Sequence, residues 1–350
     1  MKTFISAFLA VTLFCTANAS GQEVIKPSDR VVSSYVTWWS HVMPDPELLT
    51  QVNFAFGNVR SSFDGVRIKN ERRLRKIIAL KKQNPELKVV LSIGGWGSGN
   101  FSEMAASAEY RRSFCEDCAK VCREYGLDGI DIDWEYPGNG EDAHISWSPD
   151  DKDNFTLLMR DLREILGTGK LLTLASSCRP GYIDFHSVMK YVDYVNLMTY
   201  EMSEGPCDKF HNALYCSKNT RSMCTDRSVK EHIEAGVSPD KIVMGVPFYG
   251  KGIGRYKGRH SFKHIYPVPV RFSEKWDDDA KVPYLVNKKG EFVFGFENER
   301  SLKIKAQYII DNGLLGIMNW EYAGDDRKLS LTRIMHSIRH LSESSSEKAQ

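Results

Sequence analysis

The chain has 350 residues, 42% of them apolar, which is enough to bury one substantial core. Its formal net charge of +2 is close to neutral, and no basic run is dense enough to indicate nucleic acid or a membrane surface as a partner. Single-domain α/β barrels commonly have this length, and no internal repeat or interdomain linker divides the chain.

The first 19 residues have the pattern of a secretory signal. Lys2 precedes an apolar run over residues 4–14, and A-N-A at residues 17–19 fits an A-x-A cleavage site. The run is shorter than the ~20 apolar residues of a membrane span, and no later segment reaches that length. We therefore expect a secreted or periplasmic protein with no membrane span, from which residues 1–19 are removed.

Strand and helix patterns alternate along the rest of the chain. Strands are expected at residues 30–38, 51–59, 88–96, 128–137, 171–179, 194–200, 241–249 and 316–320. Helices are expected at residues 71–82, 109–125, 151–166, 228–235, 301–311 and 329–340. The alternation predicts a parallel sheet of eight strands in one domain at residues 20–342, followed by a frayed tail at residues 343–350.

One long excursion interrupts this order, from Lys251 to Glu297, between the seventh strand and its helix. Within it, residues 282–286 and 291–296 flank the turn sequence N-K-K-G, which predicts a hairpin. In a parallel barrel, an insertion that follows a strand lies over the catalytic face. We therefore expect this short insertion to lie over that face.

Cys115, Cys118 and Cys122 fall at positions i, i+3 and i+7 of a predicted helix, on its apolar side. This spacing indicates small buried hydrophobic side chains, because no second ligand pair that would complete a metal site accompanies them. The histidines form no H-E-x-x-H pattern either. We expect neither a metal nor another cofactor.

The remaining cysteines suit disulfide bonds in an exported protein. Removal of Cys15 with the signal leaves seven of the eight cysteines, so at least one has no partner in the chain. Cys207, Cys216 and Cys224 lie in a long polar stretch, where cysteines commonly link loops. Together with Cys178 they allow two disulfides in three connectivities, and the sequence does not choose among them.

The most informative stretch is D-G-I-D-I-D-W-E-Y-P at residues 128–137. Apolar residues alternate there with Asp131, Asp133 and Glu135, so a strand places the three carboxylates on one face. Acids this close cannot all ionise easily, and the pKa of at least one rises. Glu135 is nearest the carboxyl end of the strand, where a parallel barrel has its active site. We predict that Glu135 is a general acid that Asp133 and Asp131 tune.

This stretch resembles the signature of glycoside hydrolase family 18, the chitinase family. The family pattern D-x-x-D-x-D-x-E is filled by Asp128, Asp131, Asp133 and Glu135. The resemblance implies an α/β fold, a single (β/α)8 TIM barrel. It implies as substrate and partner chitin or another oligosaccharide that contains β-1,4-linked N-acetylglucosamine. Many members carry a larger α+β insertion after the seventh strand, so the short one here implies a shallower groove.

Two further motifs resemble the family at strand ends. S-I-G-G at residues 92–95 matches S-x-G-G, where glycines such as Gly95 let the substrate or a neighbouring backbone approach closely. M-T-Y-E at residues 198–201 matches M-x-Y-[DN], with Met198 and Tyr200 on one face and the Tyr200 hydroxyl directed inward. Glu201 stands where Asp or Asn is usual, and its longer side chain is expected to reach the acetamido group or Asp133.

Aromatic residues complete the predicted site. G-I-M-N-W-E at residues 316–321 resembles the eighth strand of the family, whose tryptophan, here Trp320, forms the floor of the sugar subsite beside the scissile bond. Tyr35, Phe56, Trp96 and Trp147 are further candidates for the groove, and each is equally explained as a packing residue.

The family mechanism uses the substrate as the nucleophile. Glu135 protonates the glycosidic oxygen while the 2-acetamido carbonyl attacks the anomeric carbon, and the configuration is retained. Asp133 holds the acetamido N–H, and Tyr200 orients the acetamido oxygen.

Three functions stay open from the sequence. The first is a monomeric chitinase. The second is an endo-β-N-acetylglucosaminidase that cuts N-glycans or a peptidoglycan-related polymer. The third is a catalytically silent chitin-binding lectin, against which the intact Glu135 argues.

Overall fold

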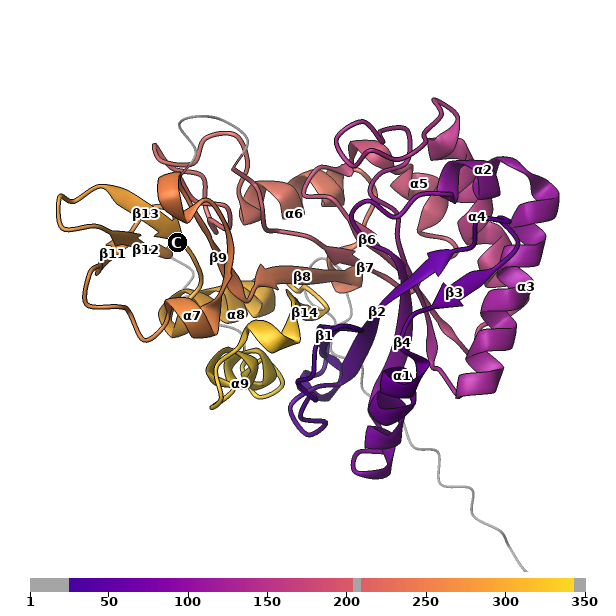
Figure 1. The fold of residues 1–350 in the computed structure, drawn as a ribbon, viewed down its shortest axis with the longest axis horizontal. Helices are drawn as coiled ribbons and strands as arrows, with labels where there is room; N and C mark the ends of the chain where they lie inside the picture. The colour runs from indigo at the N-terminus through magenta and orange to yellow at the C-terminus, as the bar shows by residue number, and fades with distance from the viewer. Residues whose placement is uncertain (1–24, 204–208, 343–350) are drawn as a thin grey trace, which may run out of the picture.

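The computed structural model of the protein describes residues 25–203 and 209–342. The predicted signal at residues 1–19, the tail at residues 343–350 and Cys207 lie outside the described residues. A barrel of strands surrounded by helices forms most of the structure. A second sheet lies to one side of this barrel, on the left of Figure 1.

Eight parallel strands of the described residues close the barrel, one in each of the ranges that the sequence predicted. They are β1 (Val31–Thr37), β2 (Gln51–Val59), β4 (Lys88–Gly94), β5 (Gly129–Asp133), β6 (Leu171–Ser176), β7 (Tyr194–Leu197), β8 (Ile242–Pro247) and β14 (Gly316–Trp320). Their order is β1-β14-β8-β7-β6-β5-β4-β2, and β1 pairs with β2 to complete the ring. The short strand β3 (Val66–Ile68) pairs with β2 antiparallel, outside the ring. The predicted (β/α)8 TIM barrel is therefore confirmed.

Helices cover the outside of the barrel near the predicted positions. The longer ones are α1 (Glu71–Ile78), α3 (Ala108–Tyr125), α4 (Asp151–Leu166), α6 (Thr225–Glu234), α8 (Glu299–Asp311) and α9 (Ser330–Ser337). Two helices that the sequence did not predict, α2 (Phe101–Ala106) and α5 (Phe185–Val188), are too short to show a helical period. Over residues 25–203 and 209–342, no helix has the length and apolar content needed to cross a membrane.

Local residues fix the ends of these helices. The Ser107 side chain accepts a hydrogen bond from the backbone N–H of Tyr110 at the start of α3. Gly126 ends the same helix with φ 69°, a left-handed conformation that glycine adopts without a Cβ penalty. At α8, Asn298 and Ser301 form a reciprocal capping box. These hydrogen bonds fix the start of α8.

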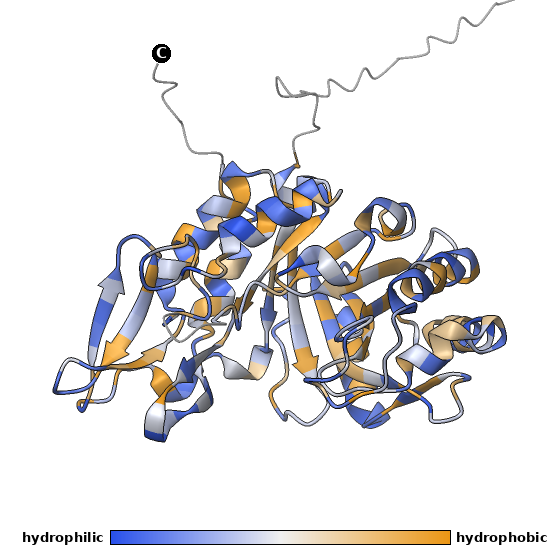
Figure 2. Ribbon diagram, turned by 90° about the horizontal axis from the view of Figure 1, so that it is seen from above, coloured by the Kyte–Doolittle hydropathy of each residue, from blue (hydrophilic) through white to orange (hydrophobic). Residues whose placement is uncertain are grey.

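The two faces of β5 point to different surroundings. Ile130 and Ile132 face the helices and belong to the large core outside the barrel. Asp131 points inward and contacts strands across the barrel, so the predicted alternation is confirmed. An inner cluster fills the barrel beside it, formed by Tyr35, Ala55, Phe56, Ala175, Tyr194, Met198, Val243 and Met318. Hydrophobic residues gather along the central strands, and the outer turns of the helices are mostly hydrophilic (Figure 2).

The insertion after β8 is a sheet of its own. Its elements are β9 (Tyr249–Gly252), β10 (Gly258–Ser261), α7 (Phe262–Ile265), β11 (Ser273–Asp277), β12 (Val282–Val286) and β13 (Phe292–Gly295). The predicted hairpin is confirmed as β12 and β13, and the antiparallel order of the whole sheet is β10-β9-β13-β12-β11. The other strands have only four or five residues each, so no alternating pattern marked them in the sequence.

The cysteines occupy the environments that the sequence indicated. Cys115, Cys118 and Cys122 are buried in the core between α3 and the barrel, as predicted. Cys216 and Cys224 form a disulfide, which selects one of the three possible connectivities. A second disulfide, which would join Cys178 to Cys207, stays a prediction, because Cys207 lies outside the described residues.

Removing the Cys216–Cys224 bond is expected to lower the free energy of unfolding by about 2–3 kcal/mol, because it closes a short loop with a separation of eight residues. Urea unfolding of a variant with both residues changed to serine measures this loss. Serine at the buried Cys118 is the comparison, since this position contributes packing and no cross-link. An unchanged urea midpoint in the double variant would contradict a structural role for the bond.

Candidate active site

Asp131 lies at the centre of the barrel and is fully buried. Both carboxylate oxygens accept two hydrogen bonds each, from donors on four other barrel strands. The donors are Tyr35 Oη at 2.9 Å, Ser92 Oγ at 2.7 Å, Thr173 Oγ1 at 2.6 Å and Asn196 Nδ2 at 3.0 Å. Burial raises the pKa of Asp131 although these hydrogen bonds oppose the shift. Asp131 therefore fixes the centre of the barrel and is not free to contact a ligand.

Asp133, two residues further along β5, is also buried, but its hydrogen bonding is incomplete. Its Oδ1 has no hydrogen-bond partner among the residues that the structure describes. Burial, and then the negative charges of Glu135 and Asp131, raise the pKa of Asp133 well above its usual range. A buried polar atom without a partner is costly. Asp133 is thus suited to receive a donor from a bound molecule.

Glu135 follows the carboxyl end of β5 and is half-buried. Burial raises the pKa of Glu135 to about 7, although a hydrogen bond with Tyr136 and the positive charge of Arg259 lower it. A carboxyl group with this pKa can hold a proton and release it near neutral pH. A carboxyl group with a raised pKa therefore lies where the sequence predicts a general acid, and the catalytic role of Glu135 stays a prediction.

Tyr200 stands beside these acids, just after β7. Burial and the charges of Asp133 and Glu135 raise the pKa of Tyr200 well above its usual range, so its hydroxyl stays protonated. Close packing fixes its ring, since a Cβ at Gly245 would lie 3.0 Å from a ring carbon of Tyr200. Met198 is buried in the inner cluster and packs beneath the site. Tyr200 can therefore donate a hydrogen bond, whereas Met198 contributes packing.

Glu201 faces the insertion. Its carboxylate accepts a hydrogen bond from Tyr249 Oη at 2.7 Å, lies 3.3 Å from Lys251 Nζ, and forms an ion pair with Arg259. Burial raises the pKa of Glu201, but its hydrogen bond and charge interaction with Arg259, together with the Lys251 charge, lower it to about 2. Glu201 is therefore ionised and neutralised by cations of the insertion. A contact between Glu201 and a bound sugar stays a prediction.

Aromatic rings form the floor beside the acids. Trp320 is half-buried and stacks on Phe56, with centroids 5.5 Å apart and an angle of 17°. The centroid of the Tyr35 ring lies 5.9 Å from that of Trp320. Tyr35 and Phe56 are themselves buried, so they are packing partners of Trp320. Gly95 has φ 88°, and a Cβ there would lie 2.6 Å from the Phe56 ring, so only glycine fits.

Exposed aromatic side chains lie on the loops that follow β4 and β5. Trp96 is 56% exposed and Trp147 is 44% exposed. The rings of Trp96 and Tyr136 lie edge to face with centroids 6.4 Å apart, and those of Tyr136 and Tyr182 are stacked with centroids 4.6 Å apart. Flat exposed rings are suited to the apolar faces of sugars. The sequence analysis did not single out Tyr136 and Tyr182, although Tyr136 directly follows the acidic motif.

Sequence analysis also missed Arg259, Tyr249 and His211, which surround Glu201. No motif marks them. Tyr249 and Arg259 come from the insertion and His211 from the segment between β7 and α6, so only the folded chain brings them together. In the part of the chain that the structure describes, no group of three or more His, Cys, Asp or Glu side chains could hold a metal ion.

The fold and these residues define a class of protein, a (β/α)8 barrel with a group of carboxyl side chains at the carboxyl end of one strand. The model of the family described as "Glycosyl hydrolases family 18" matches residues 31–325. The chain belongs to this family.

Known relatives agree with the assignment. Chitinase A1 of Niallia circulans is 33% identical over 333 residues, which cover 82% of this chain and 46% of that protein. The chain thus spans about half the length of this relative. The structure of a family 18 N-acetylglucosaminidase from Paenibacillus barengoltzii is similar with a TM-score of 0.80, 34% identity, and coverage of 88% of this chain and 99% of that chain. A group IV chitinase of Ostrinia furnacalis, solved with allosamidin, has a TM-score of 0.80 and 27% identity over 90% of this chain and 100% of its own.

Proposed function

We propose that the protein hydrolyses β-1,4 linkages between N-acetylglucosamine units, as a chitinase, with retention of configuration and participation of the substrate's acetamido group. The observation that carries this proposal is the pair formed by Glu135 and Asp133. Glu135 has a pKa of about 7, and Asp133 offers a buried oxygen without a partner among the described residues. Membership of family 18 and the chitinases among the relatives support the substrate class.

In the first step Glu135 gives its proton to the glycosidic oxygen. The bond between C1 and that oxygen breaks, and its electron pair leaves with the departing sugar. The carbonyl oxygen of the 2-acetamido group bonds to C1 from the opposite face and forms an oxazolinium ion. Asp133 accepts a hydrogen bond from the acetamido N–H and stabilises the positive charge, while Tyr200 orients the acetamido oxygen.

In the second step Glu135, now a carboxylate, takes a proton from a water molecule. The water oxygen bonds to C1 on the face that the leaving sugar vacated, and the bond between C1 and the acetamido oxygen breaks. Two inversions at C1 give net retention, and Glu135 is protonated again. A sugar without the N-acetyl group lacks the nucleophile and should not react.

The charge state of Glu201 supports this choice of nucleophile. Glu201 is a further carboxylate close enough to raise the pKa of Glu135 by its charge. Its own charge is neutralised by Arg259 and Lys251, and Tyr249 donates a hydrogen bond to it. A carboxylate held in this way is a poor nucleophile, so the substrate's own acetamido oxygen is the better candidate.

A second candidate function is the release of single N-acetylglucosamine units. The Paenibacillus barengoltzii structure, matched over 99% of its chain, is described as that of an N-acetylglucosaminidase. An endo-β-N-acetylglucosaminidase acting on N-glycans would use the same residues on a different substrate. A silent lectin is the least supported alternative, because Glu135 is present and has a raised pKa.

Mass spectrometry of reaction products separates these candidates. The protein and its Glu135→Gln variant are incubated with chitin hexasaccharide and, separately, with an N-glycosylated protein. Short oligosaccharides from the parent alone support the chitinase, and only monosaccharide supports the second candidate. Release of glycan from the glycoprotein with the hexasaccharide intact would move the assignment to N-glycans. Cleavage of neither substrate would contradict the proposal.

The rate should fall as pH rises through about 7. Glu135 must hold its proton to act as the acid, and burial raises its pKa to about 7, so the active fraction falls about tenfold per pH unit above that value. The dependence of kcat/KM on pH measures this limb, with circular dichroism at each pH as the control for folding. A rate that rises between pH 7 and pH 9 would exclude Glu135 as the acid.

We also propose that the protein is exported and acts as a monomer. The pattern of residues 1–19 and the Cys216–Cys224 disulfide support an oxidising compartment. The closed barrel leaves few unpaired strand edges for association, which supports a monomer. Cell fractionation and light scattering test the two statements.

A further inference from the structure

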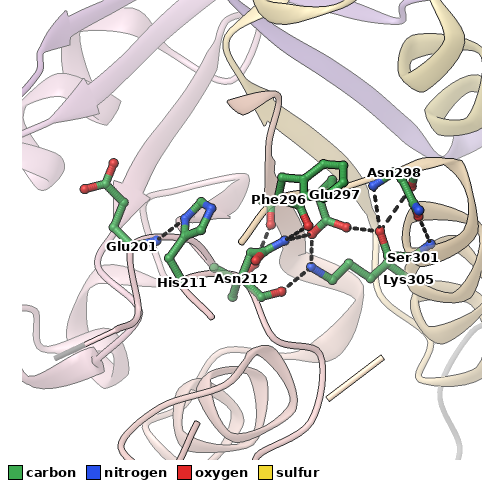
Figure 3. Close-up of polar contacts among 10 residues, drawn as sticks. Glu201, His211, Asn212, Phe296, Glu297, Asn298, Ser301 and Lys305 are labelled. Carbon is green, nitrogen blue, oxygen red and sulfur yellow. Dashed lines mark hydrogen bonds and ion pairs between the residues drawn. The ribbon is translucent and has the colours of Figure 1, made fainter. Parts of the chain in front are cut away.

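Glu201 has a left-handed backbone conformation, and His211 is hydrogen-bonded to its backbone. Its φ is 60°, in the left-handed region that side chains other than glycine rarely adopt. His211 holds this turn with two of its groups. Its Nδ1 accepts a hydrogen bond from the Glu201 N–H at 3.4 Å, and its backbone carbonyl accepts one from the Met202 N–H at 3.0 Å. Figure 3 shows the contact between His211 and Glu201.

The His211 ring is suited to this role. It is buried, and burial lowers the pKa of His211 to about 3, so the ring is neutral and Nδ1 is available as an acceptor. The ring also lies against Tyr249, with centroids 5.4 Å apart. Because the Tyr249 hydroxyl donates to the Glu201 carboxylate, His211 supports both the backbone and the side chain of Glu201.

Asn212, the residue after His211, connects this segment to the end of the insertion and to α8. Asn212 Nδ2 donates to the Phe296 carbonyl at 3.0 Å and to Glu297 Oε1 at 2.7 Å. The Asn212 carbonyl accepts a hydrogen bond from Lys305 Nζ at 2.5 Å. Asn212 therefore ties the loop after β7 to the end of the insertion and to α8 (Figure 3).

A buried ion pair anchors this connection. Glu297 and Lys305 form a salt bridge with side chains that are 1% and 0% exposed. Ser301 Oγ donates to Glu297 Oε2 at 2.5 Å, and Ser301 is also part of the capping box at the start of α8. A buried pair with its hydrogen bonds satisfied has one well-defined geometry. It provides a fixed point for His211.

We propose that His211, anchored through Asn212 to the buried Glu297–Lys305 pair, is a positioning residue that holds Glu201 against the cations of the insertion beside Glu135. The inference rests on the proposed function, in which Glu135 is the acid. It assigns His211 no contact with the substrate.

The consequence for Glu135 follows from the charges around it. Glu135 is faced by Asp133, Tyr136, Tyr200, Arg259 and Glu201. Arg259 lowers its pKa, and Glu201 raises it. If Glu201 moves away, the Arg259 charge near Glu135 is no longer balanced, and Glu135 loses its proton at lower pH.

Changing His211 to Phe fills the space and removes the acceptor, whereas changing it to Asn keeps an oxygen near the position of Nδ1. His232→Phe is the matched control, because His232 is also buried and neutral but bonds to Ser176 and Ser228. We expect His211→Phe to lower kcat/KM by about tenfold to a hundredfold. The basic limb of its pH profile of kcat/KM should move to lower pH. His211→Asn should restore part of the rate and part of the limb's position. His232→Phe should leave the basic limb at the pH of the parent. An unshifted limb in His211→Phe would overturn the proposal.

A second measurement does not depend on activity. Carbon-13 NMR of the Glu201 carboxyl group should give a pKa of about 2 in the parent and a value closer to that of an ordinary glutamate in His211→Phe. The same titration in both proteins would overturn the positioning role. If the parent cleaves no N-acetylglucosamine substrate but the titration shifts, the proposed function fails and the positioning of Glu201 by His211 stands.

Discussion

Replacing Glu135 by glutamine is expected to lower kcat on chitin oligosaccharides by about 10²–10⁴-fold, the usual contribution of a general acid. Glutamine keeps the size and polarity of the side chain but has no carboxyl proton to give. The pKa of Glu135 is about 7 because of burial, so the parent holds that proton in a large fraction of molecules at neutral pH. Substrate binding should persist, because Asp133, Tyr200 and Trp320 are unchanged.

Steady-state kinetics with a chromogenic chitin oligosaccharide measure this loss, and calorimetry with the intact oligosaccharide measures binding. Glu86→Gln is the matched control, since Glu86 is exposed between α1 and β4, away from the acids. A Glu135→Gln variant with kcat within threefold of the parent would rule out the assigned acid.

Replacing Asp131 by alanine is expected to lower the free energy of unfolding by about 3–5 kcal/mol. Four buried donors on four strands lose their acceptor, and each unpaired donor in the barrel interior is costly. Packing inside the barrel leaves little room for replacement by water. The effect should therefore exceed that of most single substitutions.

Urea unfolding followed by fluorescence measures the loss. Asp131→Asn keeps one acceptor oxygen and should lose less, and Asp153→Ala on the exposed side of α4 should lose little. Equal midpoints for Asp131→Ala and the parent would show that the central carboxylate is not needed for stability.

The barrel could be predicted from the sequence because its signals are local and repeated. Each barrel strand has β-branched or other apolar residues, and helical patterns lie between most of the strands, so order and spacing together indicate the fold. Some elements of three to six residues were missed, such as β3 and α2, because so few residues do not establish a period. The hairpin β12–β13 was predicted since its turn sequence is distinctive, whereas β9 and β10 pair only once the insertion is folded.

The acids of the site were predicted for a similar reason. The alternation of residues 130–135 determines which side chains share a face, and β5 together with the two residues after it carries them all. The surroundings of Glu201 were not predictable in this way. Arg259 and Lys251 come from the insertion more than 45 residues later in the chain, and His211 lies 10 residues after Glu201 in a stretch without a motif. Their meeting depends on tertiary packing, for which a single sequence gives no pattern.

The resemblance to family 18 added what residue patterns alone could not. From charges and spacing, Glu135 could be predicted to be a general acid, but the proposed role of the acetamido group came from the resemblance to the family. The structure adds the incomplete hydrogen bonding of Asp133, which provides a physical reason for that role. It also shows that Glu201 faces cations of the insertion, which the sequence motif did not indicate.

The most direct test is proton NMR of the first product formed from chitin hexasaccharide, with a fully de-N-acetylated hexasaccharide as the comparison. The proposed mechanism predicts that the new reducing end appears first as the β-anomer and that the de-N-acetylated compound is not cleaved. A first product in the α-configuration, or cleavage of the compound without acetamido groups at a similar rate, would contradict substrate-assisted hydrolysis by Glu135.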